Sequence, residues 1–216
     1  MNVNKDLIEY IDKNVFPEYS KNDEGHNLEH IKYVIRRSFE LIEENKLDVN
    51  HDMVYTIASY HDIGHHIDSE RHEIVSAEIM YKDKELPKYF TKDELIIIKE
   101  AIEDHRASSK KEPRSIYGKI VSSADRNNNV DDCLFRTYTY GKQLNPSATD
   151  EELFLRAYDV LTKKFGENGY AKFFFKDKQY EEFLKELREL LKDKDNYINT
   201  QREYIKKYKM YNKNVG

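Results

Sequence analysis

The stretch SYHDIGHHID, residues 59–68, decides how both the fold and the chemistry of this chain are interpreted. Val54 and Ile57 lie seven and four residues before His61, so helical spacing places the His61 imidazole on the same face as these apolar side chains. A polar group buried on such a face costs free energy unless it finds a partner. We therefore expect other parts of the chain to supply that partner, and a metal ion with further ligands is one way to do so.

Helical periodicity extends in both directions from this stretch. Asn50 is the expected N-cap of the helix that contains His61, and Gly64 is placed to end it. The spacing of apolar residues predicts further helices, and no segment shows the alternation of a strand. We therefore predict an all-α fold, a helical bundle with additional C-terminal helices, with helices over 4–16, 26–44, 50–61, 72–80 and 92–106, a helix after Pro113 that reaches Asp125, and helices over 150–165, 178–192 and 195–209.

The expected domain organisation has two parts. Residues 1–134 form a metal-binding helical domain with an N-terminal helix, and residues 135–216 form a C-terminal helical extension packed on it. A chain of 216 residues with 38% hydrophobic and 36% charged residues is long enough for one sizeable core and has the composition of a soluble, helix-rich protein.

Charge and cysteine content exclude several classes of function. A net charge of −5 provides no positive field to recruit bulk nucleic acid. The single cysteine, Cys133, excludes an internal disulfide and a paired-cysteine zinc site, so nitrogen and oxygen atoms must hold any metal. No apolar run is long enough for a membrane span or an export signal. We expect a cytoplasmic protein that binds neither membrane nor bulk nucleic acid and is a monomer or a homodimer.

Several other helices present a polar side chain on or beside an apolar face. His30 lies at the rim of such a face, and His105 and Asp125 lie on two others. Each has an ordinary alternative: an isolated histidine is commonly a hydrogen-bonded core residue, and Asp125 can pair with Arg106 or Arg126. His65 and His66, the remaining histidines of the stretch, also have an ordinary alternative, since they can form a solvated helix end.

The order of these residues resembles a known family. His30 followed by Val34, His61-Asp62 within YHDIG and Asp125 within SSADR are similar to the pattern of the HD-domain metal-dependent phosphohydrolases, over about residues 24–130. GHNLEHIKYVI, RHEIVSAEI and AIEDHRASS are similar to the small stand-alone bacterial members. The resemblance implies a helical bundle that holds a divalent metal through His30, His61, Asp62 and Asp125. It does not extend to the Glu-Asp pair of guanosine tetraphosphate hydrolases or to the Gly-Tyr-Pro signature of cyclic-di-GMP phosphodiesterases.

Two imidazoles and two carboxylates suit Mn, Fe, Co, Ni or Zn, with Mg as a weaker occupant. One ion is expected, and His66, His72 or His105 can complete a second site or transfer protons. The candidate general acids and bases lie close to the HD pair in sequence: His66, Asp68 and Glu73. The candidate phosphate-binding cations are Arg106, Lys110 and Arg126.

The predicted function is a metal-dependent phosphohydrolase that acts on a small phosphate ester or anhydride, with a nucleotide as the favoured substrate. Both a phosphatase and a pyrophosphohydrolase are open, because no base-recognition motif is visible. The alternative is a non-catalytic, metal-containing HD domain that binds a phosphorylated signal. A third interpretation, a helical interaction protein with a fortuitous histidine cluster, predicts no stoichiometric metal.

Overall fold

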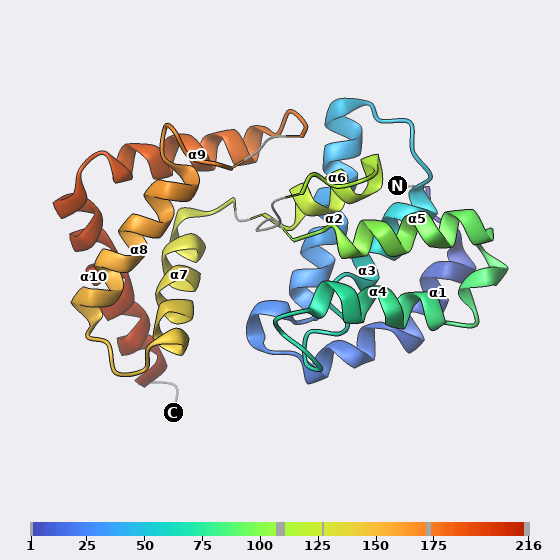
Figure 1. Ribbon diagram of the computed structural model, residues 1–216, viewed down its shortest axis with the longest axis horizontal. Helices are drawn as coiled ribbons and strands as arrows, with labels where there is room; N and C mark the ends of the chain where they lie inside the picture. The colour runs from blue at the N-terminus through green and yellow to red at the C-terminus, as the bar shows by residue number, and fades with distance from the viewer. Residues whose placement is uncertain (1, 107–110, 127, 172–173, 214–216) are drawn as a thin grey trace. The chain divides into compact units, whose positions relative to one another are not determined.

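The computed structural model describes residues 2–106, 111–126, 128–171 and 174–213, and the regular elements in these residues are all helical (Figure 1). They comprise ten α-helices and three short 3-10 helices, so the predicted all-α fold is confirmed. The chain divides into two compact units, which are Met1–Arg126 with Phe173–Lys176, and Asn127–Lys172 with Asp177–Gly216.

The first unit contains six α-helices and three 3-10 helices within its described residues. In chain order they are α1 (Lys5–Asn14), η1 (Phe16–Lys21), η2 (Glu24–His26), α2 (Leu28–Asn45), α3 (His51–Tyr60), α4 (His72–Lys82), η3 (Leu86–Lys88), α5 (Lys92–Glu103) and α6 (Ile116–Ala124).

Helix α3 is the centre of this unit. Every residue from Met53 to Tyr60 is buried, and α3 packs against α2, α4, α5 and α6. An apolar helix surrounded on all sides is stabilised by the burial of its whole circumference. Its C-terminal end therefore delivers the His61-Asp62 pair to the interior of the unit, where both side chains are buried.

Side-chain caps explain where the helices begin. Asn50 accepts hydrogen bonds from the backbone N–H groups of Asp52 and Met53, as predicted for the N-cap of α3. Thr91 forms a capping box with Glu94 at the start of α5. Such caps satisfy N–H groups that have no partner within the helix.

Two tyrosine hydroxyls connect three elements of the first unit through one carboxylate. Tyr10 of α1 and Tyr60 of α3 each donate a hydrogen bond of 2.6 Å to Asp83 Oδ2, just after α4. Burial and this carboxylate raise the pKa of Tyr60 far above its usual range, so its hydroxyl stays a donor.

Replacing Asp83 with alanine is expected to lower the free energy of unfolding by about 1–3 kcal/mol, because two partly buried hydroxyls lose their acceptor. Chemical denaturation measures the change, with exposed Asp12→Ala as the matched control. Equal free energies of unfolding for Asp83→Ala and wild type would show that the contact contributes nothing.

The helix boundary that matters for the site and differs from the sequence prediction is the end of α5. Helix α5 ends at Glu103, so His105 and Arg106 follow the helix and are not part of it. Helix α6 begins at Ile116 with Ser115 as its N-cap, after Pro113 as the sequence predicts. Ile102 is the last buried residue of α5, and His105 turns back to donate from Nδ1 to its carbonyl oxygen, at 2.7 Å.

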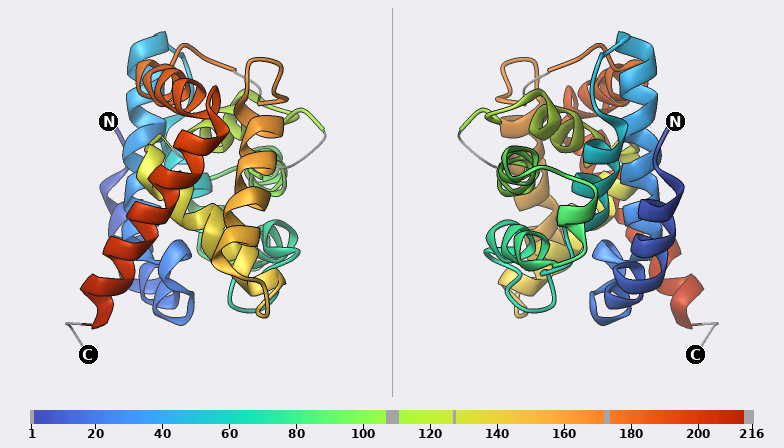
Figure 2. Two further views of the ribbon diagram at one scale, coloured as in Figure 1. Left: turned by 90° about the vertical axis from the view of Figure 1, so that its left-hand side faces the viewer. Right: turned by 90° about the vertical axis from the view of Figure 1, so that its right-hand side faces the viewer.

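The second unit consists of α7 (Val130–Leu144), α8 (Asp150–Phe165), α9 (Lys178–Leu191) and α10 (Lys194–Lys213), of which α10 is the long red helix in the left-hand view of Figure 2. The division after Arg126 precedes the boundary predicted after 134, because Val130, Cys133 and Leu134 pack in a core with residues of α8 and α9. The sequence prediction missed α7. Its Thr and Tyr residues are weak helix formers, and packing against α8 stabilises it.

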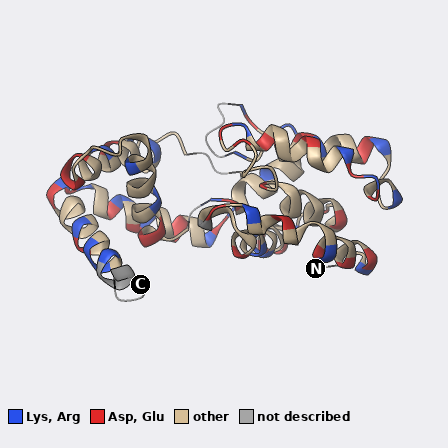
Figure 3. Ribbon diagram, turned by 90° about the horizontal axis from the view of Figure 1, so that it is seen from below, with Lys and Arg blue, Asp and Glu red and all other residues tan. Residues whose placement is uncertain are grey.

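Lysine and arginine alternate with aspartate and glutamate along most helices in Figure 3. This mixture agrees with the small net charge. Among the described residues, no helix combines the length and the apolar character of a membrane span.

Candidate metal centre

The carboxylate of Asp62 lies at the middle of four histidines. Its Oδ2 is 3.2 Å from His61 Nε2 and 3.5 Å from His30 Nε2. Its Oδ1 is 3.3 Å from His72 Nε2 and 3.4 Å from His105 Nε2. Each oxygen of one carboxylate therefore faces its own pair of imidazoles.

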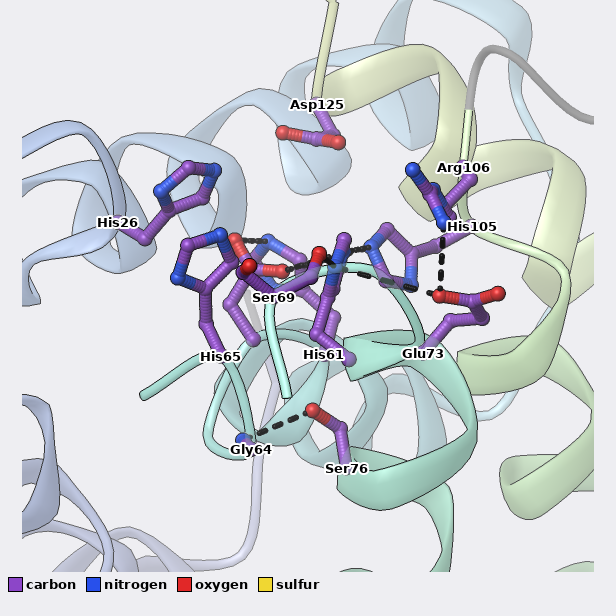
Figure 4. A network of polar contacts seen from close by, with 12 residues as sticks. His26, His61, Gly64, His65, Ser69, Glu73, Ser76, His105, Arg106 and Asp125 are labelled. Carbon is purple, nitrogen blue, oxygen red and sulfur yellow. Dashed lines mark hydrogen bonds and ion pairs between the residues drawn. The ribbon is translucent and has the colours of Figure 1, made fainter. Parts of the chain in front are cut away.

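Asp125 completes the arrangement on the Oδ2 side. Its Oδ1 lies 3.1 Å from His30 Nε2, and Figure 4 shows its side chain approaching from above the histidines. These residues form two ligand groups of three, each with atoms within 4.8 Å of one another: His30, His61 and Asp125, and Asp62, His72 and His105. We call these six residues the Asp62 centre.

Three atoms of the Asp62 centre are buried without a well-directed hydrogen bond. They are His30 Nε2, His61 Nε2 and Asp62 Oδ1. Buried polar atoms are almost always hydrogen-bonded, so such a group needs an explanation. Convergent imidazole nitrogens and carboxylate oxygens are what a divalent ion requires, and the residues present fit one.

In three of these four histidines, the Nδ1 atom, which points away from Asp62, contacts a backbone carbonyl group. Nδ1 of His61 lies 2.8 Å from the carbonyl oxygen of Ala58, and Nδ1 of His72 lies 3.0 Å from that of Ser69. His105 makes the equivalent contact to Ile102. A histidine whose Nδ1–H donates to a carbonyl presents the lone pair of Nε2, which is the arrangement of metal-binding histidines.

The protonation states of Asp62 and His72 suit metal binding. Although burial opposes ionisation, the surrounding histidines, His61 foremost, hold the pKa of Asp62 well below its usual range. Burial lowers the pKa of His72 to about 4, so this ring is neutral at pH 7. Burial also disfavours the charged form of His30, but the nearby carboxylates of Asp125 and Asp62 outweigh it and raise the pKa of His30 to about 9. His30 must therefore release a proton when an ion binds.

Sequence reasoning treated His72 and His105 only as additional possibilities, although the structure places both against Asp62. The prediction put His105 on the apolar face of a helix, where a core role was equally open. The 3.2 Å contact between the Nε2 atoms of His72 and His105 links the start of α4 to the segment after α5. The spacing of residues along the chain does not predict this contact between His72 and His105.

The other predicted site residues lie in different surroundings. His66 is exposed and lies 3.1 Å from Asn22 Oδ1 through its Nδ1, and Asp68 Oδ1 accepts from the backbone N–H groups of Glu70 and Arg71. Glu73, by contrast, lies beside the Asp62 centre, with its Oε2 4.0 Å from His72 Nδ1.

Of the predicted phosphate-binding cations, Arg106 contacts Glu73 beside the Asp62 centre. Its guanidinium donates to the carbonyl oxygen of Glu70 and to Glu73 Oε2. Arg126 lies over the ring of Phe174, with its Cζ 5.2 Å from the ring centroid. Lys110 lies outside the described residues.

Comparison with known proteins gives a family for part of the chain. A family model described as HD domain matches residues 27–129. Residues 27–129 are an HD domain. A crystal structure of a predicted HD superfamily hydrolase from an uncultured Thermotogales bacterium is similar, with 21% identity, coverage of 73% of this chain and 86% of that chain, and a TM-score of 0.46. No curated protein matches the chain.

The HD domain contains the whole Asp62 centre, from His30 to Asp125. Its residues come from the start of α2, the end of α3, the start of α4, the segment after α5 and the end of α6. Asp23 and His26, which approach this centre from outside, precede the matched residues.

Proposed function

We propose that this HD domain is a metal-dependent phosphohydrolase that acts on a small phosphate ester or anhydride. The observation that carries the proposal is the convergence on Asp62 of buried imidazole nitrogens that have no well-directed hydrogen bond. A protein with a merely structural histidine cluster would satisfy these atoms internally.

His30, His61, Asp62 and Asp125 would hold one ion, and Asp62, His72 and His105 would hold a second, so that Asp62 would contribute to both sets of ligands. This donor set suits Mn, Fe, Co, Ni or Zn, and Mg less well. Divalent ions bound at this centre would lower the pKa of a reacting water and neutralise the charge that develops on phosphorus.

The other polar residues near the centre are suited to position substrate and protons. Arg106 has 35% of its side chain exposed beside the centre, and a partly exposed guanidinium can bind two phosphate oxygens at once. Glu73 holds Arg106 through a 3.2 Å ion pair and lies against His72. We assign Arg106 to phosphate binding and Glu73 to orientation of Arg106 and transfer of a proton through water.

The finer part of the proposal is that the substrate is a nucleotide. A phosphatase would release orthophosphate from a nucleoside monophosphate, and a pyrophosphohydrolase would release pyrophosphate from a triphosphate. The geometry of the Asp62 centre is compatible with either reaction, since both require a water to attack phosphorus.

The experiment is product formation from nucleoside mono-, di- and triphosphates with added Mn²⁺, followed by mass spectrometry for wild type, Asp125→Ala and the exposed control Asp93→Ala. We expect turnover by wild type and Asp93→Ala, and a loss of at least about 100-fold in Asp125→Ala, because a direct ligand contributes more than the residues behind it. Equal activity of wild type and Asp125→Ala would contradict the assignment of Asp125. No turnover of any nucleotide would overturn the nucleotide part of the proposal.

A further inference from the structure

Beside the Asp62 centre, Asp23, His26 and His65 form a third group of potential ligands. One ligand atom from each lies within 4.8 Å of the other two. None of the three belongs to the Asp62 centre, and the proposed mechanism does not use them. Figure 4 shows His26 and His65 together on one side of the histidines, with Arg106 and Glu73 on the other side.

The three side chains face one another closely. His26 Nδ1 lies 2.8 Å from Asp23 Oδ1, and His65 Nδ1 lies 3.6 Å from Asp23 Oδ2. The two imidazole rings are stacked, with centroids 3.7 Å apart and an angle of 17° between their planes. The 3.6 Å distance is too long for a hydrogen bond, so Oδ2 and the His65 nitrogen remain able to bind a cation.

The group is held in place by a residue outside it. The amide nitrogen of Asn22 donates to the carbonyl oxygens of His26 and Asp62, at 3.0 and 2.9 Å. The Asn22 amide oxygen accepts from the backbone N–H of His66, next to His65. One amide therefore joins the segment that carries Asp23 and His26 to the turn that carries His65. Such support fixes ligand-bearing segments before an ion binds.

From this geometry we propose that Asp23, His26 and His65 form a further divalent cation site at the edge of the Asp62 centre. Two imidazoles and one carboxylate favour a borderline ion such as Mn²⁺ or Zn²⁺ and leave positions for other oxygens. The stacked rings separate by rotation about their side-chain bonds, so that both can direct a nitrogen to the ion.

The position of this site indicates its use. The His65 ring lies 5.1 Å from that of His72, and the His26 ring lies 6.0 Å from that of His30. An ion between Asp23 and these rings would lie next to a substrate at the Asp62 centre, where its open positions can accept oxygens of a second phosphate group. This use, unlike the site itself, rests on the proposed function.

The site is expected to bind its ion more weakly than the Asp62 centre does. The Asp23 side chain is 58% exposed and that of His26 is 23% exposed, whereas that of Asp62 is 3% exposed. Ligands that remain in contact with water compete with it for the ion and are held less rigidly.

Counting bound ions tests the proposal without any assay of activity. Wild type, Asp23→Asn and His65→Gln are titrated with Mn²⁺, and free Mn²⁺ is followed by electron paramagnetic resonance. Both variants are expected to bind about one ion fewer per chain than wild type and to keep the tighter ions. The matched control is His51→Gln, since His51 begins α3 and belongs to none of the three ligand groups, and it should bind as wild type does.

Equal numbers of ions in wild type, Asp23→Asn and His65→Gln would overturn the proposal. The wild-type titration provides a second test that does not depend on whether Asp23→Asn and His65→Gln fold. If wild type becomes saturated with Mn²⁺ and binds no ion more weakly than the ions that Asp62→Ala loses, the proposal is also overturned. Failure of the proposed function has a different signature, namely a full set of bound ions without hydrolysis of phosphate esters.

Discussion

Replacing Asp62 with alanine is expected to abolish metal binding at the Asp62 centre and to lower turnover by at least about 10³-fold, the order of loss that follows removal of a residue on which a whole catalytic group depends. The reason is geometric. Oδ1 faces His72 and His105 while Oδ2 faces His61 and His30, at 3.2–3.5 Å, so one carboxylate serves both ligand groups. Loss of Asp125 removes a ligand from one group only.

Metal content after purification and kcat with added Mn²⁺ measure this effect. The exposed Asp48→Asn variant, which makes a similar change of charge, is the control. A folded Asp62→Ala protein that retains two tightly bound ions would contradict the proposal that Asp62 contributes to both ligand groups. Asp62→Asn separates charge from shape, because the amide keeps one acceptor oxygen but cannot bridge two ions as an anion. It should lose nearly as much activity as Asp62→Ala.

Gly64→Ala is expected to destabilise the first unit by about 1–3 kcal/mol or more, the typical cost of forcing extra atoms into a packed interior. A Cβ atom at Gly64 would lie 2.7 Å from Val75 Cγ1 and 2.9 Å from the backbone nitrogen of Ser76. The second contact is to backbone and cannot be relieved by a change of rotamer. The turn after His61-Asp62 would have to move away from α4, the helix that begins with His72.

Thermal and chemical denaturation of the metal-free protein measure the loss of stability, and Mn²⁺ binding measures the effect on the centre. Ser76→Ala is the matched comparison, because it removes only the 2.9 Å hydrogen bond from Gly64 N–H to Ser76 Oγ. We expect it to cost about 1 kcal/mol and to leave metal binding intact. A Gly64→Ala protein as stable as wild type would show that the turn can shift without cost.

The helices and most of their limits were predictable because they depend on local patterns. Asn50 with the apolar spacing that follows it is sufficient to begin α3 and to orient its residues. The prediction failed at α7, where burial of Cys133, Leu134 and Tyr138 outweighs weak helix formers. It also extended α5 to Arg106, because periodicity does not reveal that His105 turns back to the carbonyl group of Ile102.

The sequence by itself determined an all-α protein, an HD domain over residues 27–129 and the four residues of the His, His-Asp, Asp pattern, because helical periodicity and motif order are properties of the chain alone. Their role as metal ligands stays a prediction, although the structure brings all four together. Only the tertiary structure placed His72 and His105 on the second oxygen of Asp62, and stacked His26 on His65 beside Asp23. Those contacts depend on how helices rotate and pack against one another and on the turns that connect them, which residue spacing within one helix does not encode.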